Sequence, residues 1–374
     1  MKVKFQPGNI AVSEGAIVAG LKFFAGYPIT PVNEIFEYLS QELPKYGGII
    51  YQAEDEIAAI NAIIGASWAG VKAMTATSGP GYSLMAEGIG YAVMVEAPIV
   101  IVYSMRAGPS TGVATGTGQG DVIQSKWASH GHYELIVLAP NSVQECFDLT
   151  IEAFNLAEKY RVPVIVLIDA VLSHMSEKYV WKSPSEVKLV KRKKPTVPPG
   201  QYKPFEPDSE DLVPPMACYG EGYAVLAESL SHDEKGYYDP SKETYAKLVK
   251  RLTMKIIKNK RNIVMSETYM VSDANILFIA FGSASRVVHA IVRELRSKGV
   301  RAGLFRPITL WPIDDELKKV ASKAEKIVVV EMNYGQLYRE IVHILGNRKV
   351  FLAPVISPDP PTIDDVYSSI GEIL

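Results

Sequence analysis

The sequence has few cysteines and no surplus of either charge. Cys146 and Cys218 are the only cysteines among 374 residues. They cannot form a disulfide framework, a CxxC redox site or a four-cysteine set of iron–sulfur ligands. We therefore expect a reducing compartment, and any iron–sulfur cluster must come from another chain. Lys and Arg number 39 against 41 Asp and Glu, whereas a nucleic-acid-binding protein usually carries a basic surplus.

Long apolar runs are also missing. Crossing a bilayer takes about 20 consecutive apolar residues, and the longest candidate, residues 92–103, contains Glu96 and Pro98. The first residues lack the charged start, apolar centre and small-residue cleavage site of a signal peptide. The sequence predicts a cytoplasmic chain with no membrane or nucleic-acid partner.

Residues 1–178 alternate short β-branched runs with alanine-rich stretches of helical periodicity. This alternation is typical of βαβ units in a doubly wound, mostly parallel sheet. The strand-like runs are almost wholly apolar, as expected when helices cover both faces of the sheet. We expect strands at 48–51, 73–77, 98–103, 135–139 and 163–168, and helices at 14–24, 33–42, 56–69, 83–95 and 142–160.

The composition changes twice further along the chain. Residues 179–271 are rich in Lys, Pro, Tyr and acidic residues, which predicts an extended connection across the surface. It ends in a basic helix at 242–260, whose charged face we expect to be solvated. Residues 272–374 return to the α/β rhythm and predict a second, smaller doubly wound domain. We expect its strands at 276–281, 301–306 and 326–331, and its helices at 285–298 and 313–324.

The loop Gly26–Pro31, GYPITP, is stiff because two prolines fix the backbone on either side of Thr30. Pro31 suits the first position of a helix, which would make Thr30 its N-cap. One interpretation is therefore a well-formed helix start. The other is a rigid rim that contacts a ligand through the Thr30 hydroxyl and backbone groups.

Three carboxylates, Glu54, Asp55 and Glu56, open an alanine-rich helix. The helix dipole alone explains Glu54 and Asp55, because it favours negative charge in a first turn. The helix is apolar on every face and is therefore expected to be buried. Glu56 at its mouth is drawn out of water, and a desolvated carboxylate has a raised pKa and can share a proton with a basic ligand atom.

Two glycine-rich loops follow strands of the predicted sheet. TATSGPG, residues 75–81, permits close ligand approach, but it is neither a P-loop nor a dinucleotide fingerprint. Residues 105–121 lie past the carboxyl end of a strand, where open α/β sheets bind ligands. Arg106 suits a bidentate carboxylate, and Ser110 and Thr111 add hydroxyls. The alternative is a flexible surface loop with a salt-bridged arginine.

Metal binding is not predicted. His130 and His132 are the best candidate ligands, but no acidic or cysteine partner stands at a suitable spacing.

Taken together, the motifs resemble a known family. An acidic residue opening an alanine-rich helix, followed by TSGPG and PIVIV, resembles the pyrimidine-binding domain of thiamine diphosphate enzymes. GYPITP, MRAGPSTG and GQGD resemble more narrowly the alpha subunit of 2-oxoacid:ferredoxin oxidoreductases, in particular the 2-oxoglutarate type. The resemblance continues through SLSHDEKG and LFRPITLWP to VVVEMNYGQL, so it covers nearly the whole chain.

The resemblance implies a fold for each of the three zones. Residues 1–178 would form the thiamine diphosphate-binding pyrimidine domain, a doubly wound sheet. Residues 179–271 would form the extended connection with its basic helix. Residues 272–374 would form a smaller α/β domain like the C-terminal domain of transketolase.

The resemblance also implies an activity, the coenzyme A-dependent oxidative decarboxylation of a 2-oxoacid, here 2-oxoglutarate, with electrons passed to ferredoxin. The expected catalytic residues are Glu56, Thr30 and Arg106. Glu56 would bind the cofactor together with Pro28 and Ile29. Thr30 and Arg106 would hold the substrate's 1-carboxylate, and Ser110 and Thr111 a second carboxylate.

The resemblance also implies a separate beta subunit. It has no GDG…N motif for Mg²⁺ and diphosphate and no cysteine set for a 4Fe–4S cluster. The resemblance implies that the partner supplies both and shares the thiamine diphosphate, so that this chain is active only in an oligomer. Two alternatives remain: a subunit of a cluster-free thiamine diphosphate decarboxylase or synthase, and a non-catalytic scaffold subunit.

Overall fold

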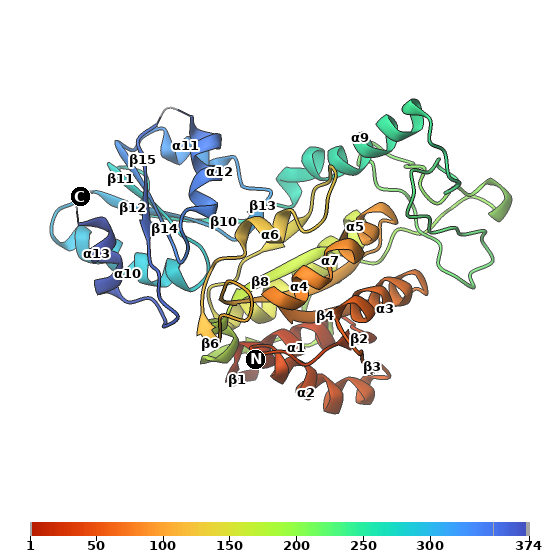
Figure 1. The fold of residues 1–374 in the computed structure, drawn as a ribbon, viewed down its shortest axis with the longest axis horizontal. Helices are drawn as coiled ribbons and strands as arrows, with labels where there is room; N and C mark the ends of the chain where they lie inside the picture. Colours follow the sequence, from red (N-terminus) through yellow and green to blue (C-terminus); the bar gives the residue numbers. More distant parts are fainter. Residues whose placement is uncertain (1, 347, 372–374) are drawn as a thin grey trace.

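The computed structural model describes residues 2–346 and 348–371. Two sheets with flanking helices make up most of the molecule, and a long connection extends along one side (Figure 1). The first sheet has eight strands and the second has five, and most of their strand pairs are parallel. The predicted α/β class is therefore confirmed. Within the described ranges, no helix has both the length and the apolar character that crossing a membrane requires.

The first sheet has the order β13-β7-β8-β5-β4-β2-β3, with β6 paired to β5. All pairs on this path are parallel except β13 with β7, and β6 is antiparallel to β5. Strands β4 and β8 are buried along their whole length because helices cover both faces. The strands are β2 (Phe23–Gly26), β3 (Ile49–Gln52), β4 (Ala73–Ser78), β5 (Ile99–Ala107), β6 (Val113–Thr117), β7 (Ile136–Leu138), β8 (Val164–Asp169) and β13 (Thr309–Trp311).

Two long helices of this region, α3 (Glu56–Trp68) and α7 (Val143–Tyr160), begin at capping side chains. Asp55 accepts a hydrogen bond from the Ala58 backbone N–H at 2.8 Å, and Ser142 accepts one from Glu145 at 3.2 Å. The helices are α1 (Gly8–Val18), α2 (Asn33–Glu42), α3 (Glu56–Trp68), α4 (Gly79–Leu84), α5 (Ala86–Met94), α6 (Val122–Lys126), α7 (Val143–Tyr160) and α8 (Ala170–His174). A two-stranded antiparallel ribbon, β1 (Lys2–Pro7) with β9 (Ser176–Trp181), joins the two ends of this region.

The helix predicted at 14–24 is wrong at both ends. Helix α1 begins at Gly8 and ends at Val18, and Phe23 and Phe24 belong to strand β2. A short apolar run is compatible with either a buried helix or a buried strand, and here the pairing of β2 with both β3 and β4 decides the outcome.

The long connection is held by a buried arginine. Its backbone lacks sheet partners over most of its length, so its carbonyls need other donors. Arg161 Nη1 donates to the carbonyls of Pro204, Pro214 and Pro215 at 2.8, 3.3 and 3.2 Å. The connection contains the 3₁₀ turns η2 (Pro184–Glu186) and η3 (Pro199–Gln201), and the chain also forms η1 (Leu43–Tyr46) and η4 (Lys260–Asn262).

Helix α9 (Lys242–Asn259) follows the connection and is anchored by a buried ionic cluster. Arg251 donates two hydrogen bonds to the Glu96 carboxylate, at 2.9 and 2.6 Å. Lys255 contacts the same carboxylate at 2.6 Å and the Arg161 carbonyl at 2.8 Å. The basic helix therefore turns two of its cations inward, while most of its other charged residues remain exposed.

The second sheet has the order β10-β12-β11-β14-β15, with only β10 antiparallel. Its strands are β10 (Ser266–Tyr269), β11 (Ile276–Ile279), β12 (Ala302–Pro307), β14 (Lys326–Glu331) and β15 (Val350–Pro354). Its helices are α10 (Gly282–Ser297), α11 (Glu316–Ala321), α12 (Gln336–Leu345) and α13 (Ile363–Ile370). Strand β13 leaves this region to pair with β7 of the first sheet, so the two sheets share one stretch of chain.

Candidate active site

The candidate site lies at the carboxyl ends of the parallel strands β2 to β5. Thr30 follows β2, Glu56 follows β3, Gly81 follows β4, and Arg106 lies near the end of β5. Parallel strands end at one edge of their sheet, and open α/β sheets bind ligands at that edge. The topology thus gathers residues that are far apart in the sequence.

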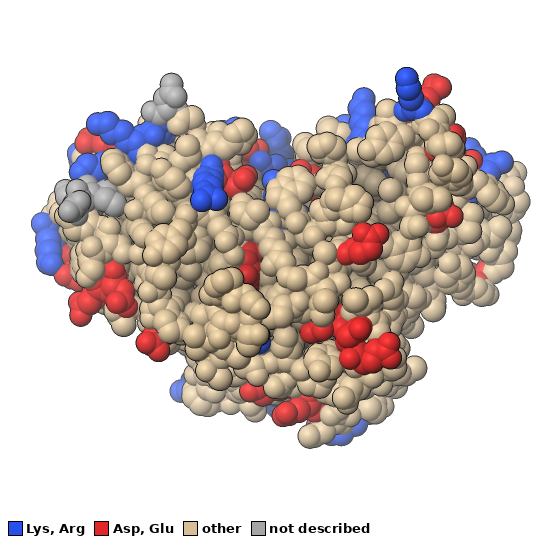
Figure 2. Space-filling model, in the orientation of Figure 1, with Lys and Arg blue, Asp and Glu red and all other residues tan. Residues whose placement is uncertain are grey.

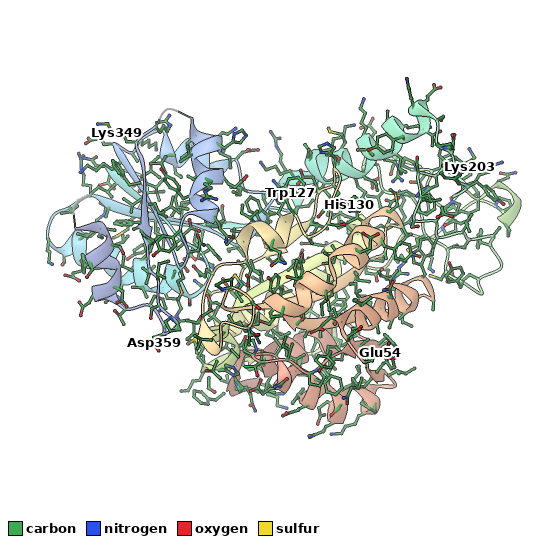
Figure 3. All side chains as sticks on the ribbon, in the orientation of Figure 1. Glu54, Trp127, His130, Lys203, Lys349 and Asp359 are labelled. Carbon is green, nitrogen blue, oxygen red and sulfur yellow. The ribbon has the colours of Figure 1, made fainter. Side chains whose placement is uncertain are left out.

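Glu56 is the first residue of α3 and is only 3% exposed. Burial raises the pKa of this carboxyl above its ordinary value, and the neighbouring Asp55 carboxylate raises it further. The backbone N–H of Glu56 and the Thr77 hydroxyl act in the opposite direction but do not cancel the effect. Glu54, in contrast, is exposed at the edge of the molecule (Figure 3). Glu56, and not Glu54, is the carboxyl with the properties of a proton-sharing group.

The glycine at position 81 makes room for the Glu56 carboxylate. A Cβ at Gly81 would clash with Glu56 Oε1 and with Thr77 Oγ1, which are the nearest atoms to it. Residues 77–81 are the TSGPG motif, which the sequence analysis identified as a loop that permits close ligand approach. By itself this motif was a weak indication of a site. The motif serves to bring backbone close to a buried carboxyl.

Arg106 and Thr30 are brought together. Arg106 is 7% exposed, and its Nη1 donates to the Thr30 carbonyl at 2.9 Å. Its Nε is buried and finds no hydrogen-bond partner within residues 2–346 and 348–371. The guanidinium therefore fixes the loop after β2 and has one donor without a partner in the described residues.

The rest of the GYPITP loop is supported from beneath. Asn9 of α1 is fully buried, and its Nδ2 donates to the Pro31 carbonyl at 2.7 Å. Ile29 is half-buried and packs against the core, whereas Pro28 is exposed. The Thr30–Pro31 peptide bond is cis. No local sequence signal pointed to Asn9, because its contact with the loop spans 22 residues.

Ser110 and Thr111 lie on the loop between β5 and β6, and both are exposed. Residues 113–117, which the sequence assigned to a loop, form strand β6 and pair with β5. The segment is therefore a hairpin whose tip presents the two hydroxyls to solvent. No hydrogen bond joins either residue to Arg106 in the part of the chain that the structure describes.

Asp121 is a site residue that the sequence analysis did not select. It lies in the loop between β6 and α6, close enough to Arg106 and Tyr103 that both affect its pKa. Burial raises the pKa of Asp121 to about 6, against the lowering effects of the Tyr103 phenol and the Arg106 charge. The signal was the GQGD motif, which entered only as a family resemblance.

Metal-binding clusters are absent from the described residues: no group of three His, Cys, Asp or Glu side chains is placed to hold an ion. His130 and His132 are exposed. Cys146 and Cys218 are buried as free thiols.

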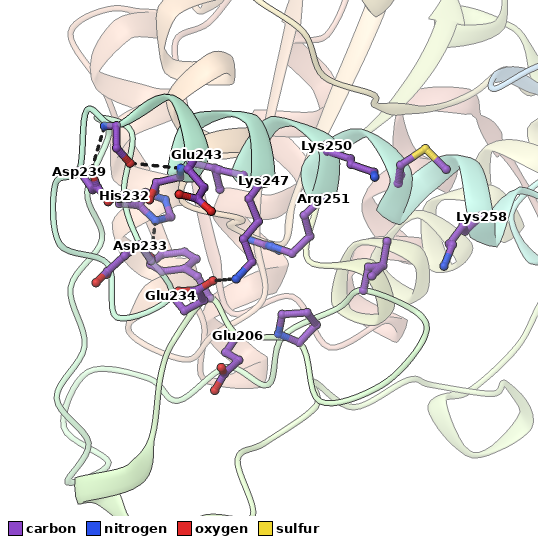
Figure 4. Close-up of a pocket in the computed structure, with 17 residues that line it drawn as sticks. Glu206, His232, Asp233, Glu234, Asp239, Glu243, Lys247, Lys250, Arg251 and Lys258 are labelled. Carbon is purple, nitrogen blue, oxygen red and sulfur yellow. Dashed lines mark hydrogen bonds and ion pairs between the residues drawn. The ribbon is translucent and has the colours of Figure 1, made fainter.

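A cavity of about 870 Å³ lies away from this site, between α9 and the connection (Figure 4). Its lining mixes both signs of charge, and Lys247 forms an ion pair with Glu234 across it. None of the candidate site residues lines it. Its size alone does not make it the centre of the chemistry.

Comparison with known proteins supports the resemblance along nearly the whole chain. A family model described as pyruvate flavodoxin/ferredoxin oxidoreductase, thiamine diphosphate-binding, matches residues 14–251. The pyruvate:ferredoxin oxidoreductase core domain II matches residues 274–357. Two domain families therefore follow one another along the chain.

Individual relatives agree with these matches. The 2-oxoglutarate synthase subunit KorA of Methanocaldococcus jannaschii is 53% identical, over 92% of this chain and 92% of its own length. The ketoisovalerate oxidoreductase subunit VorB of Methanothermobacter thermautotrophicus is 39% identical, over 100% of this chain and 98% of its own length.

A solved structure of similar fold is 2-oxoglutarate:ferredoxin oxidoreductase from Magnetococcus marinus with 2-oxoglutarate, coenzyme A and succinyl-CoA bound. It matches 99% of this chain with a TM-score of 0.93 and 34% identity. This chain spans 65% of that longer chain. The chain belongs to the pyruvate flavodoxin/ferredoxin oxidoreductase family, and its resemblance to the alpha subunits of 2-oxoacid:ferredoxin oxidoreductases is confirmed.

Proposed function

We propose that this chain is the alpha subunit of a 2-oxoglutarate:ferredoxin oxidoreductase, which converts 2-oxoglutarate and coenzyme A to succinyl-CoA and carbon dioxide and passes the electrons to ferredoxin. The substrate follows from the 53% identity to a 2-oxoglutarate synthase subunit, compared with 39% to a ketoisovalerate oxidoreductase subunit. The observation that carries the catalytic role is the buried, protonatable carboxyl of Glu56 at the start of α3.

The residues at the start of α3 fit the aminopyrimidine end of thiamine diphosphate. Gly81 leaves room at the Glu56 carboxylate that any side chain would fill. When bound, the cofactor supplies the nucleophilic carbon and the electron sink that decarboxylation requires. Glu56 shares a proton with a ring nitrogen of the pyrimidine, and its low-dielectric surroundings strengthen that hydrogen bond. Pro28 and Ile29 form the neighbouring wall.

Arg106 and Thr30 orient the substrate. The unmet Arg106 Nε and the remaining guanidinium donors bind the 1-carboxylate of the 2-oxoacid. The hydrogen bond from Arg106 to the Thr30 carbonyl holds the Thr30 hydroxyl on the same side. Ser110 and Thr111, at the tip of the β5–β6 hairpin, reach the second carboxylate when the partner closes the site.

A beta subunit completes this half-site. It would supply the diphosphate site with its Mg²⁺ and the 4Fe–4S cluster, as the resemblance to 2-oxoacid:ferredoxin oxidoreductases implies. In keeping with this proposal, the described residues of this chain hold two separate buried cysteines and no group of three side chains placed to bind a metal ion. The central part of the face shown in Figure 2 carries few charged side chains. Large apolar side chains are exposed around the site, among them Ile57, Leu84 and Trp127. Such a surface suits a stable interface with another protein.

The test is a purification of this chain with its partner, followed by viologen reduction with 2-oxoglutarate, pyruvate and a branched 2-oxoacid side by side. We expect coenzyme A-dependent reduction with 2-oxoglutarate as the best substrate. Preference for the branched 2-oxoacid would assign the chain to the ketoisovalerate group of relatives. Decarboxylation without viologen reduction would favour a cluster-free enzyme, and no turnover with any 2-oxoacid would favour a scaffold subunit.

A further inference from the structure

The Asp121 carboxyl lies beside the backbone of Gly79 in the candidate site. Its Oδ2 is buried, and nothing in the described part of the chain offers it a hydrogen bond. The two carboxylate oxygens lie 3.6 and 3.8 Å from the position that a Cβ on Gly79 would take. Because Gly79 has no side chain, a space the size of a methyl group remains beside the carboxyl oxygens.

Two further buried polar atoms in this neighbourhood also lack partners in the described residues. One is Arg106 Nε, and the other is the hydroxyl of Ser78, the residue before Gly79. Buried polar groups are rarely left unpaired, because each costs the free energy of its desolvation. A cationic donor without a partner, near a carboxyl that has one oxygen without a partner, points to an anionic ligand that also accepts a hydrogen bond.

The loop that carries Asp121 is fixed by the residues that follow β14 of the second sheet. Gln119 is fully buried, and its backbone N–H donates to the Met332 carbonyl at 3.4 Å. Asn333 Nδ2 donates back to the Gln119 carbonyl at 2.7 Å. These contacts position Asp121 before any ligand arrives, which reduces the entropic cost of binding.

The groups around Asp121 leave it as a titrating carboxyl. The Tyr103 phenol hydrogen-bonds to the Asp121 carboxyl, and this bond and the Arg106 charge lower its pKa against the effect of burial. Burial raises the pKa of Tyr103 well above its ordinary value, so the phenol stays neutral. Across the site, Glu56 on α3 is the other carboxyl whose pKa is raised. Any experiment on Asp121 must therefore separate it from Glu56.

We propose that Asp121 contacts the 2-oxoacid directly and binds it in the carboxylic acid form. The acid donates a hydrogen bond to an oxygen of the substrate whose carboxylate is held by Arg106. The ionised form of Asp121 repels that carboxylate, so that binding above the pKa requires the uptake of one proton. This inference rests on the proposed function, because it needs an anionic substrate at Arg106.

The test uses the assembled complex loaded with thiamine diphosphate, and 2-hydroxyglutarate as the probe. The probe keeps both carboxylates but lacks the 2-oxo group, so it is not decarboxylated. Titration calorimetry in two buffers of different ionisation enthalpy gives the affinity and the number of protons taken up. We expect about one proton per site near pH 7 and an affinity that weakens up to about tenfold per pH unit between pH 6 and 8. The Asp121→Asn variant, which keeps a donor at this position, should bind without proton uptake and without this pH dependence.

Two variants serve as controls. Glu54→Gln removes an exposed carboxyl nearby and should keep the wild-type pH dependence, and Glu56→Gln should keep it too. The inference is overturned if the wild-type complex takes up no proton, if Asp121→Asn keeps the pH dependence, or if only Glu56→Gln removes it. Viologen reduction with 2-oxoglutarate in the same preparation separates the two proposals. An active complex with one of these results overturns the role of Asp121 alone, whereas an inactive complex that does not bind the probe overturns the proposed function as well.

Discussion

Two buried glutamates show how the same side chain serves different purposes in two regions of the molecule. Glu96 lies under α9 and is fully buried. Burial acts to raise its pKa, but the charges of Arg251, Lys255 and Arg161 outweigh burial and hold the pKa well below its ordinary value. Glu56 is almost as deeply buried, and burial raises its pKa as well. Here the increase remains, because no cation is among the groups that act on its carboxyl.

The comparison indicates what each carboxyl is for. A carboxylate with three cationic neighbours is permanently ionised and serves to join α9 to the first sheet. A carboxyl with a raised pKa destabilises the fold whenever it ionises, and such groups are concentrated at functional sites. Both carboxyls are buried, so the number of neighbouring cations distinguishes the structural carboxyl, Glu96, from the one with the properties of a functional group, Glu56.

The sharpest way to break this comparison is to neutralise Glu96. Glu96→Gln leaves Arg251 and Lys255 buried without their counter-charge, and such a loss costs about 3–5 kcal/mol of unfolding free energy. Chemical denaturation should show a clear fall in the midpoint. The control is Glu234→Gln, which removes a surface ion pair with Lys247 and should cost less than about 1 kcal/mol. Equal stability of the two variants would contradict a structural role for the buried cluster.

The second prediction concerns activity. Glu56→Gln should lower kcat about 10²–10³-fold, which is the typical cost of losing one preorganised contact to the transition state. Assembly with the partner should remain intact, because the amide has the same shape. Glu54→Gln is the matched control and should leave kcat unchanged, since that side chain is exposed. Similar losses in both variants would mean that the wrong carboxyl has been assigned.

A third prediction sharpens the role of the space beside Glu56. Gly81→Ala puts a methyl group against Glu56 and Thr77, and such overpacking costs about 1–3 kcal/mol. Gly65→Ala in the exposed interior of α3 meets nothing within 4 Å and should stabilise by about 0.5–1 kcal/mol. Thermal melting of the two variants measures the difference. An unchanged melting temperature for Gly81→Ala would show that the pocket beside Glu56 tolerates a side chain.

The smallest expected effect is the pH dependence of stability. Because the pKa of Glu56 is raised in the folded state, the folded state binds more protons than the unfolded state, and stability falls as pH rises from the ordinary value through the raised one. A pKa that differs by one between the two states changes the free energy of unfolding by about 1.4 kcal/mol. In cofactor-free protein, Glu56→Gln should remove the part of this fall that Glu56 causes and melt above wild type at neutral pH. Parallel pH profiles for wild type and variant would contradict the raised pKa.

Local patterns predicted much of the fold. Helix α2 lies at the predicted residues 33–42, because its apolar spacing acts within one turn, although its N-cap is Val32 and not Thr30. Strand β13 could not be predicted, because three residues of the second region pair with β7 about 170 positions earlier. The prediction of one helix over residues 14–24 failed for the same reason. Pairing with β3 and β4 makes the end of this stretch a strand, and no local pattern contains that information.

The site divides in the same way. Glu56 was selected because its position at the start of an apolar helix is a local signal, and the raised pKa agrees with that argument. The meeting of Arg106 with Thr30 was proposed only through a family resemblance, since 76 residues separate them. Asp121 and Asn9 were missed because their roles depend on packing against elements that no local pattern brings near. The roles assigned to these residues stay predictions.

The most direct measurement is a structure of the assembled pair with thiamine diphosphate bound. We expect a pyrimidine nitrogen of the cofactor within hydrogen-bond distance of the Glu56 carboxylate, about 2.6–3.2 Å, with Gly81 beside it and the diphosphate on the partner. A cofactor that lies away from the first turn of α3, or that meets Glu54 in place of Glu56, would contradict the assignment.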